Sequence, residues 1–255
     1  MSDPSLSAAV QAYWDRHIHD LDVAVSPMGT ADFFRELDEY RFDKLRYLRQ
    51  ILDVPTYRGK QVLEVGCGLG IDLSYWAQNG AQVTGIDLSS TAIELARLNL
   101  AQRGLRASLH IMDGERLAFE DNSFDMVYAH GVLQYTADAR RMLDEIYRVL
   151  RPGGEVILGV YNRYSWLNLL SHLAFVELEH EDAPVLRKHS VREVTELLAA
   201  FAEVRLVLER FPVRTRLHHG VKGLLYNEVF VRGFGLLPRR LVRPLGWHII
   251  AFATK

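Results

Sequence analysis

From Gln61 onward, short apolar runs of strand length alternate with longer segments in which apolar residues recur at helical spacing. We expect Thr91 and Glu94 to open the second helix as a capping box, and Ser190 and Glu193 to open the last one. Strands separated by helix-length crossovers indicate an α/β fold with a parallel, doubly wound sheet. The expected strands are 61–65, 82–86, about 107–111, 124–129, 155–160, 203–208 and 246–254, and the expected helices are about 71–79, 91–103, 138–150 and 190–201.

Three stretches fall outside this alternation. Residues 1–58 combine aromatic and charged residues in helical patterns, and they contain too little apolar material to fold independently. We therefore expect an N-terminal helical cap over a core domain at 59–255. Two insertions interrupt that domain, about 161–189 after the fifth strand and 211–245 after the sixth.

A glycine-rich turn follows the first strand, in the stretch QVLEVGCGLGIDL. Gly66, Gly68 and Gly70 let the backbone pass close under a ligand and let the next helix begin facing it. The dinucleotide fingerprint GxGxxG would need its third glycine at the position of Ile71. Glu64 is an acid inside a core strand, which is costly to bury without a partner. We expect Glu64 either to brace the loop or to form part of a cofactor cradle.

Two aspartates stand where the next strands end. Asp87 follows the second strand, where a carboxylate can accept hydrogen bonds from two ribose hydroxyls, or instead cap the following helix. Asp113 follows the third strand, where it can accept from an exocyclic amine such as that of adenine, or instead form a turn before Gly114. Together with the three glycines, both aspartates favour a nucleoside-like ligand at the carboxyl edge of the sheet.

The composition narrows the class of protein. The 255 residues are 49% hydrophobic, and the formal net charge is −2, which gives no overall attraction to nucleic acid. The single cysteine, Cys67, rules out an internal disulfide and indicates a reducing compartment. The first residues have no signal-peptide pattern, and no apolar run has the length of a membrane span. We therefore expect a cytoplasmic protein.

Four motifs in order, VLEVGCGLGIDL, VTGIDLS, MDGERLAFEDNSFDMVYAHGVLQY and RVLRPGGEV, resemble those of class I S-adenosylmethionine (SAM)-dependent methyltransferases. The resemblance covers about residues 59–160 and is closest to the type-11 group of small-molecule and quinone methyltransferases. It implies a Rossmann-like, seven-stranded sheet in the order 3-2-1-4-5-7-6, whose last strand, GWHIIAFATK, is antiparallel.

The resemblance also implies a role for each matching position, with SAM as cofactor. Glu64 and the three glycines form the SAM turn, Asp87 and Leu88 hold the ribose and the adenine, and Asp113 with Gly114 holds the adenine amine. Ala129 and His130 face the methionine end and the methyl group. Cys67 occupies a spacer position, where we expect it to pack and not to act as a nucleophile.

Methyl transfer from a sulfonium needs alignment and, where the nucleophile carries a proton, a base. His130 is the first choice for this base, because histidine titrates near neutrality and this one follows the fourth strand. A purely structural role, bracing the loop, remains open. Tyr135 lies within a turn of it. His17 and His19 form a second polar group that could meet the acceptor if the cap closes, or else lie on a solvated helix face. We expect no metal site.

The acceptor is expected to be a small molecule. The turn AHGV after the fourth strand lacks the Asn/Asp-Pro-Pro-aromatic sequence that accompanies amino methylation of adenine or glutamine amides in this fold. The 211–245 connector carries seven Lys and Arg and a single acid, and it could rest on an anionic membrane beside a lipid or prenyl-quinone acceptor. The alternatives are a solvated cap helix and, for the whole chain, a SAM-binding enzyme or scaffold subunit that does not methylate.

Overall fold

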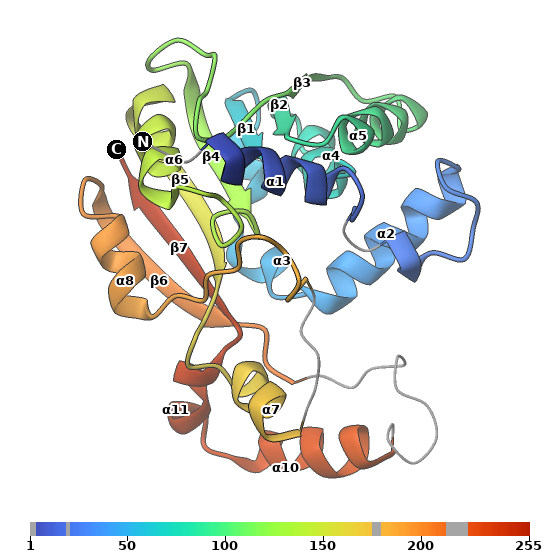
Figure 1. Cartoon of the computed structure of the whole chain (residues 1–255), viewed down its shortest axis with the longest axis vertical. Coiled ribbons are helices and arrows are strands. Elements are labelled where there is room, and N and C mark those ends of the chain that lie inside the picture. Colours follow the sequence, from blue (N-terminus) through green and yellow to red (C-terminus); the bar gives the residue numbers. More distant parts are fainter. Residues whose placement is uncertain (1–3, 19–20, 175–179, 213–223) are drawn as a thin grey trace.

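A computed structural model describes residues 4–18, 21–174, 180–212 and 224–255. Its centre is a seven-stranded sheet in the order β3-β2-β1-β4-β5-β7-β6, which confirms the predicted topology (Figure 1). Strand β7 runs antiparallel to both β5 and β6, while the other pairs are parallel. The strands are β1 (Gln61–Val65), β2 (Gln82–Asp87), β3 (Ala107–Ile111), β4 (Phe124–His130), β5 (Leu150–Tyr161), β6 (Ala202–Glu209) and β7 (His248–Thr254).

Helices cover both faces of the sheet because the strands are apolar on both sides. One core cluster joins the sheet to α6 (Ala139–Val149) and α8 (Val191–Leu197). A second joins the opposite face to α3 (Leu48–Ile51), α4 (Ile71–Gln78) and α5 (Ser90–Gln102). The sheet is therefore the middle of three layers, and the carboxyl ends of β1, β2 and β4 meet at one edge.

Two local predictions about helix starts have different outcomes. The Ser190–Glu193 capping box is present at the start of α8. The Thr91–Glu94 box was wrong, because Ser89 is the N-cap of α5 and its side chain accepts from the amide of Ala92. Ser89 is the N-cap because its backbone is extended, as a cap requires, whereas Thr91 already lies inside the helix.

Strand β5 is longer than the predicted 155–160, because it starts at Leu150. Phe124 pairs with Leu150, yet Met126 already pairs with Glu155, so the extra residues of β5 form an irregularity in the ladder. Pro152, Gly153 and Gly154 lie in this bulged segment.

The N-terminal residues pack onto the sheet domain. Helix α1 (Pro4–Trp14) lies across the edge where β1 and β4 end (Figure 1), and Gln11 donates to the carbonyl of Leu88. Helix α2 (Ala31–Lys44) is held by ion pairs of Asp38 with Arg103 and of Arg41 with Asp72. Short turns at Leu21–Val23 and Val54–Tyr57 complete the segment. The division at residue 58 stays a prediction.

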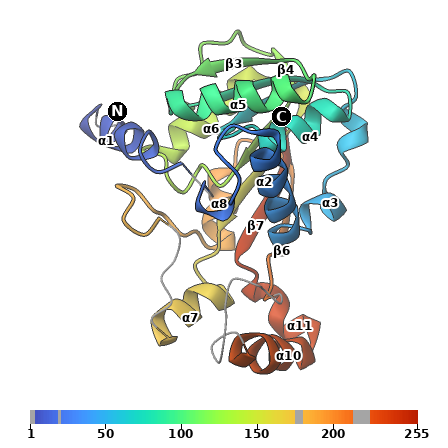
Figure 2. The same ribbon diagram turned by 90° about the vertical axis from the view of Figure 1, so that its right-hand side faces the viewer.

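Helices of the two insertions form a lobe at the far end of the molecule from α5 (Figure 2), whereas residues 180–189 lie against α1, the loop after β4 and the end of β5. Helix α7 (Trp166–Ala174) meets α10 (Val231–Leu236) through the ring of Trp166, which lies 6.3 Å from that of Phe234. Helix α11 (Arg239–Val242), a π-helical turn (Leu225–Phe230) and a 3-10 turn (Arg243–Leu245) complete the lobe. Residues 213–223 of the connector lie outside the described part. Within it, no helix has the length and apolarity needed to cross a membrane.

Candidate active site

The glycine turn after β1 has a backbone that other residues would strain. Gly66, Gly68 and Gly70 all have positive φ angles, of 69°, 49° and 71°. A Cβ at Gly66 would lie 2.4 Å from Cγ2 of Val132, so this position also lacks room for a side chain. A Cβ at Gly68 would meet nothing within 4 Å, which leaves the backbone there open to a ligand.

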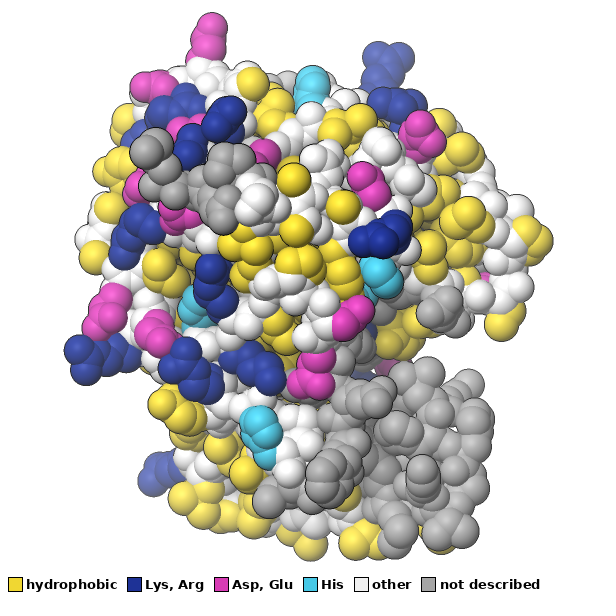
Figure 3. Space-filling view, in the orientation of Figure 1, with side chains coloured by type: hydrophobic (Ala, Val, Ile, Leu, Met, Phe, Trp, Pro, Cys, Tyr) yellow, Lys and Arg dark blue, Asp and Glu magenta, His cyan; other side chains and the backbone are white. Residues whose placement is uncertain are grey.

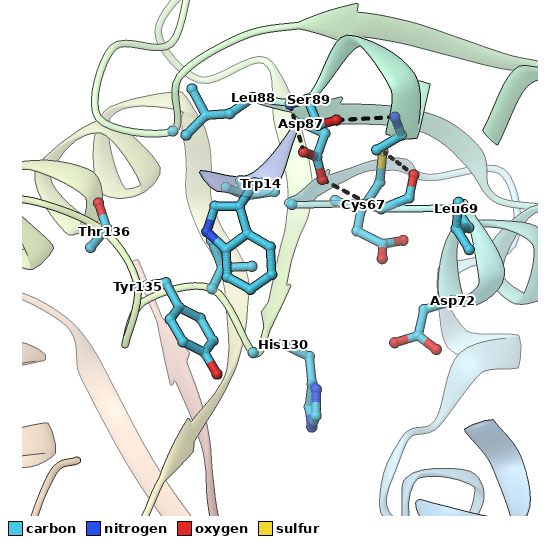
Figure 4. A pocket seen from close by; sticks show the side chains of 18 of the residues that line it. Trp14, Cys67, Leu69, Asp72, Asp87, Leu88, Ser89, His130, Tyr135 and Thr136 are labelled. Carbon is cyan, nitrogen blue, oxygen red and sulfur yellow. Dashed lines mark hydrogen bonds between the residues drawn. The ribbon is translucent and has the colours of Figure 1, made fainter. Parts of the chain in front are cut away.

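Asp87 braces this turn from the end of β2. Its Oδ2 accepts from the amide of Gly68 at 2.9 Å and its Oδ1 accepts from the amide of Ser89 at 2.9 Å (Figure 4). Burial raises the pKa of the Asp87 carboxyl, and these amide hydrogen bonds oppose the rise. The capping role is taken by Ser89, so Asp87 is left to hold the turn and to present its carboxylate at the sheet edge.

A cavity of about 230 Å³ opens beside this turn. It is bounded by the ends of β1, β2 and β4 and by residues of α1 and α2. The predicted site residues that line it are Glu64, Gly66, Gly68, Asp87, Leu88, Asp113, Gly114, His130 and Tyr135.

Four predicted site residues are placed elsewhere or not described. Gly70 is not among the described residues that line the cavity. It lies against α5, where a Cβ added to Gly70 would come 3.2 Å from the Cβ of Ala96. Ala129 is fully buried in the core. His17 is exposed and its ring stacks on that of Tyr13, 4.2 Å between centroids. His19 lies outside the described residues.

Glu64 is the most unusual acid of the cavity. It is buried, and its Oε2 has no hydrogen-bond partner among the described residues. Burial raises the pKa of this carboxyl well above its ordinary value, and the nearby charge of Asp72 raises it further. A buried carboxyl oxygen without a hydrogen-bond partner in a ligand cavity is available to a cation or a hydrogen-bond donor.

Asp113 and Gly114 form the wall beside β3. Oδ1 of Asp113 accepts from the amide of Glu115 at 2.8 Å, and burial raises the pKa of the Asp113 carboxyl. A Cβ at Gly114 would lie 2.7 Å from Cε of Met142. Three carboxylates, of Glu64, Asp87 and Asp113, thus surround one part of the cavity, and they fit the amino group, ribose hydroxyls and adenine amine of SAM, all hydrogen-bond donors.

His130 occupies a different part of the cavity, in contact with groups that the sequence analysis did not foresee. Its Nδ1 lies 3.2 Å from Nη2 of Arg41, and its Nε2 lies 3.2 Å from the hydroxyl of Tyr47. That hydroxyl also lies 2.5 Å from Nδ1 of His248, whose Nε2 is 3.2 Å from Nη1 of Arg210. Burial, followed by the charge of Arg41, lowers the pKa of His130 to about 3, so its ring is neutral near pH 7.

Asp72 anchors this cluster. Its carboxylate accepts from Nε and Nη2 of Arg41, at 3.1 and 2.5 Å, and from the hydroxyl of Tyr128 at 3.0 Å. Although burial alone would raise it, the charge and hydrogen bonds of Arg41 keep the pKa of Asp72 below its ordinary value. Arg41 is therefore held in place between an acid and His130.

Sequence signals existed for some of these residues. Asp72 directly follows the glycine turn, and His248 is a polar residue inside the apolar run of the last strand. Arg41 and Arg210 carried no signal, because Arg41 is an ordinary arginine of the expected cap and Arg210 lies between the sixth expected strand and the connector. Arg41 precedes His130 by 89 positions and Arg210 precedes His248 by 38, so no local spacing links either arginine to its partner.

Aromatic side chains form another wall. The ring of Trp14, from the end of α1, lies 4.9 Å from that of Tyr135 (Figure 4). The hydroxyl of Tyr135 lies 3.3 Å from that of Tyr161 at the end of β5. In the part of the chain that the structure describes, no group of three or more His, Cys, Asp or Glu side chains is arranged to hold a metal ion.

Comparison with known proteins identifies the domain that carries this cavity. Residues 63–158 match the family described as a methyltransferase domain. Ubiquinone biosynthesis O-methyltransferase of Alkalilimnicola ehrlichii is 30% identical over 168 residues, which cover 64% of this chain and 66% of that protein. The same enzyme of Coxiella burnetii is 32% identical over 120 residues, 47% of this chain and 50% of the relative. The matched region thus spans between half and two thirds of these relatives.

Solved structures agree on the fold. A SAM-dependent methyltransferase from Aquifex aeolicus superposes with a TM-score of 0.56 at 16% identity, covering 88% of this chain and 98% of that one. The [4+2]-cyclase SpnF superposes with a TM-score of 0.59 at 21% identity, covering 96% and 95%. Residues 63–158 therefore match a methyltransferase domain, and the chain has the fold of solved SAM-dependent methyltransferases.

Proposed function

We propose that this protein is an enzyme that transfers a methyl group from SAM to a small-molecule acceptor. The observation that carries the proposal is the two-part cavity, with a glycine turn and three carboxylates in one part and His130 in the other. When bound, SAM supplies a methyl group on a positively charged sulfur, which is an electrophile. Glu64, Asp87 and Asp113 hold this cofactor, and Leu88 lies against its base.

His130 is the residue proposed to meet the acceptor, with Tyr135 beside it. Both of its ring nitrogens have protein partners, Arg41 and Tyr47. Proton acceptance by His130 therefore requires Arg41 to withdraw from Nδ1, and the low pKa of the ring makes this a weak base at neutral pH. An acceptor that arrives already ionised would not need it.

Activity is tested by incubating the protein with methyl-labelled SAM and acceptors from several chemical classes. The expected result is a labelled small product together with S-adenosylhomocysteine. The two alternatives are a non-methylating enzyme and a scaffold subunit, and each gives a different outcome. The fold shared with the cyclase SpnF is the observation that favours testing the first of them. A non-methylating enzyme would convert an acceptor without forming S-adenosylhomocysteine, and a scaffold subunit would bind SAM without any turnover.

Cofactor binding is expected to depend on pH through Glu64. Because the pKa of its carboxyl is raised, part of the population keeps its proton at pH values where glutamate is ordinarily ionised. The ammonium of SAM favours the carboxylate, so binding should release a proton and tighten as pH rises through that pKa. Calorimetry in two buffers of different ionisation enthalpy measures this release.

Glu64→Gln should abolish the proton release and weaken SAM binding at alkaline pH. Glu120→Gln, which changes an exposed glutamate, is the matched control and should behave as wild type. Equal proton release in wild type and Glu64→Gln would contradict the role assigned to Glu64.

As a second candidate function, we propose that the acceptor is a lipid or prenyl-quinone molecule, in keeping with the names of the curated relatives. Large apolar side chains are exposed over α10, α11 and their neighbours, and hydrophobic atoms gather along that lower edge in Figure 3. Arginines 232, 240 and 243 lie among them. This combination supports a peripheral contact with an anionic membrane from the cytoplasmic side. The exposed apolar residues are Leu224, Val229, Leu236, Leu237 and Leu241.

Liposome flotation tests the membrane contact. Vesicles containing anionic lipid should carry the protein upward at low salt and release it at high salt, because the arginines supply part of the attraction. Leu236→Glu, at a side chain 86% exposed, should abolish flotation without affecting SAM binding. Val25→Glu, at an equally exposed residue outside the lobe, is the control. If the protein shows no salt-sensitive flotation, the proposed contact with an anionic membrane is wrong.

A further inference from the structure

The charged side chains of the cavity are sorted by sign. Glu64, Asp87 and Asp113 lie around the glycine turn, where the cofactor is proposed to bind. Around His130 the cavity is lined by arginines 41 and 210 and by Lys44, with His248 beside them. Asp72 is the acid that lines this part, and Arg41 holds it, while the charge of Glu209, at the end of β6, also reaches Tyr47. The part of the cavity left for the acceptor therefore has an excess of positive charge.

The hydrogen bonds of this part fix the direction of its donors. An arginine side chain only donates, so Nδ1 of His130 and Nε2 of His248 accept from Arg41 and Arg210. Each neutral ring then carries its proton on the other nitrogen, and both of these nitrogens face the hydroxyl oxygen of Tyr47. This assignment leaves neither imidazole with a free acceptor nitrogen, so the groups that remain for a ligand are donors.

The lowered pKa values of His130 and His248 indicate a positive electrostatic potential in this part of the cavity. Burial, followed by the charges of Arg210, Arg41 and Lys44, lowers the pKa of His248 well below its ordinary value, and all three of these side chains are cationic. Arg41 and Arg210 lower the pKa of His130 in the same way, with Asp72 acting in the opposite direction. A positive potential that keeps histidines neutral also stabilises an anion.

Arg210 is held in an unusual backbone conformation. Its φ angle is 63°, in the left-handed region that non-glycine residues seldom occupy. Its carbonyl accepts from the indole of Trp166 at 2.8 Å and from the amide of Trp247, which fix it at the end of β6. The side chain is thus aimed at His248 and the cavity by a strained, well-anchored residue.

We propose that the acceptor binds as an anion, with a negatively charged oxygen beside His130 in the part of the cavity that Arg41 and Arg210 line. The chemical class is a small, partly apolar molecule with an acidic hydroxyl or enol that is ionised near pH 7. Trp14 and Tyr135 supply a flat apolar wall for its body. An ionised oxygen has no proton to lose, which removes the need for His130 to act as a base. This inference rests on the proposed function only for the methylation of that oxygen, because the binding of an anion requires no turnover.

The test uses 4-nitrophenol, whose ionised form is coloured, and its uncharged methyl ether, 4-nitroanisole, with the protein saturated by S-adenosylhomocysteine. The bound dye should titrate at a pH at least about one unit lower than the free dye, which corresponds to about 10-fold preference for the anion. The ether should bind at least about 10-fold more weakly than the phenolate. Equal affinity for the two compounds, or an unshifted titration, would overturn the inference.

Variants separate this site from a general effect of charge. Arg210→Leu should raise the pKa of the bound dye and weaken phenolate binding about 10-fold, whereas Arg210→Lys should keep most of both. Arg192→Leu removes an exposed arginine of α8 and should change neither value. A loss of phenolate binding as large in Arg192→Leu as in Arg210→Leu would contradict the assignment.

Calorimetry with S-adenosylhomocysteine keeps the two proposals apart. If the cofactor product binds and the phenolate shows no preference, the acceptor inference fails while the proposed cofactor site stands. If S-adenosylhomocysteine does not bind, the proposed function fails, and the dye titration without it still decides whether this is an anion site.

Discussion

Asp87→Ala is expected to weaken SAM binding at least about 100-fold. The carboxylate holds the amides of Gly68 and Ser89 and is proposed to accept from the ribose hydroxyls. Hydrogen bonds to a charged group contribute roughly 1.5–3 kcal/mol each, so losing two of them to the ligand removes about 3 kcal/mol or more. That free energy corresponds to about 100-fold or more in Kd, which calorimetry can measure directly.

Two further measurements separate contact with the ribose from bracing of the turn. Methylthioadenosine and its 2′-deoxy analogue should differ in affinity for the wild type and should bind Asp87→Asn with nearly equal affinity. If both analogues lose the same affinity in Asp87→Asn, the carboxylate only braces the loop. Asp144→Ala, at an exposed aspartate of α6, is the control and should leave both affinities unchanged. Unaltered SAM binding by Asp87→Ala would refute the cofactor site.

Most of the fold could be predicted because its signals are local. The central strands β1, β4 and β5 are mostly apolar, as is usual for buried parallel strands, and the Ser190–Glu193 capping box lies within four residues. The start of α5 was misjudged because Ser89 and Thr91 are both good caps, and only the backbone decides between them. The bulge in β5 depends on pairing with Phe124, and its Pro152-Gly153-Gly154 sequence is equally compatible with a turn that precedes the strand.

The two parts of the cavity differed in how far they could be predicted. Glu64 lies one residue before the end of β1, Asp87 ends β2 and Asp113 follows β3, so the topology brings all three to one edge of the sheet. The cluster around His130 depends on side chains from α2, the end of β6 and the start of β7. Their meeting is a product of tertiary packing across long loops, and no spacing rule links Arg41 to Arg210.

The Gly66→Ala variant should lower both stability and cofactor affinity. A residue with a Cβ at this left-handed φ costs roughly 1–2 kcal/mol, and the clash with Val132 adds roughly 1–3 kcal/mol. Relief of the clash would shift the turn that faces the cavity, so SAM binding should fall by at least about 10-fold. Chemical denaturation and calorimetry measure the two effects. A variant as stable as wild type with unchanged SAM affinity would refute both.

Gly104→Ala is the matched control, because Gly104 has a similar φ of 65° but a Cβ there would meet nothing within 4 Å. It should lose only the conformational part, roughly 1–2 kcal/mol, and keep wild-type SAM affinity. Val132→Ala combined with Gly66→Ala removes the clashing methyl groups, so the pair should be less destabilised than the sum of the single variants. Strict additivity would mean that Val132 does not oppose a side chain at residue 66, and that backbone strain alone requires glycine there.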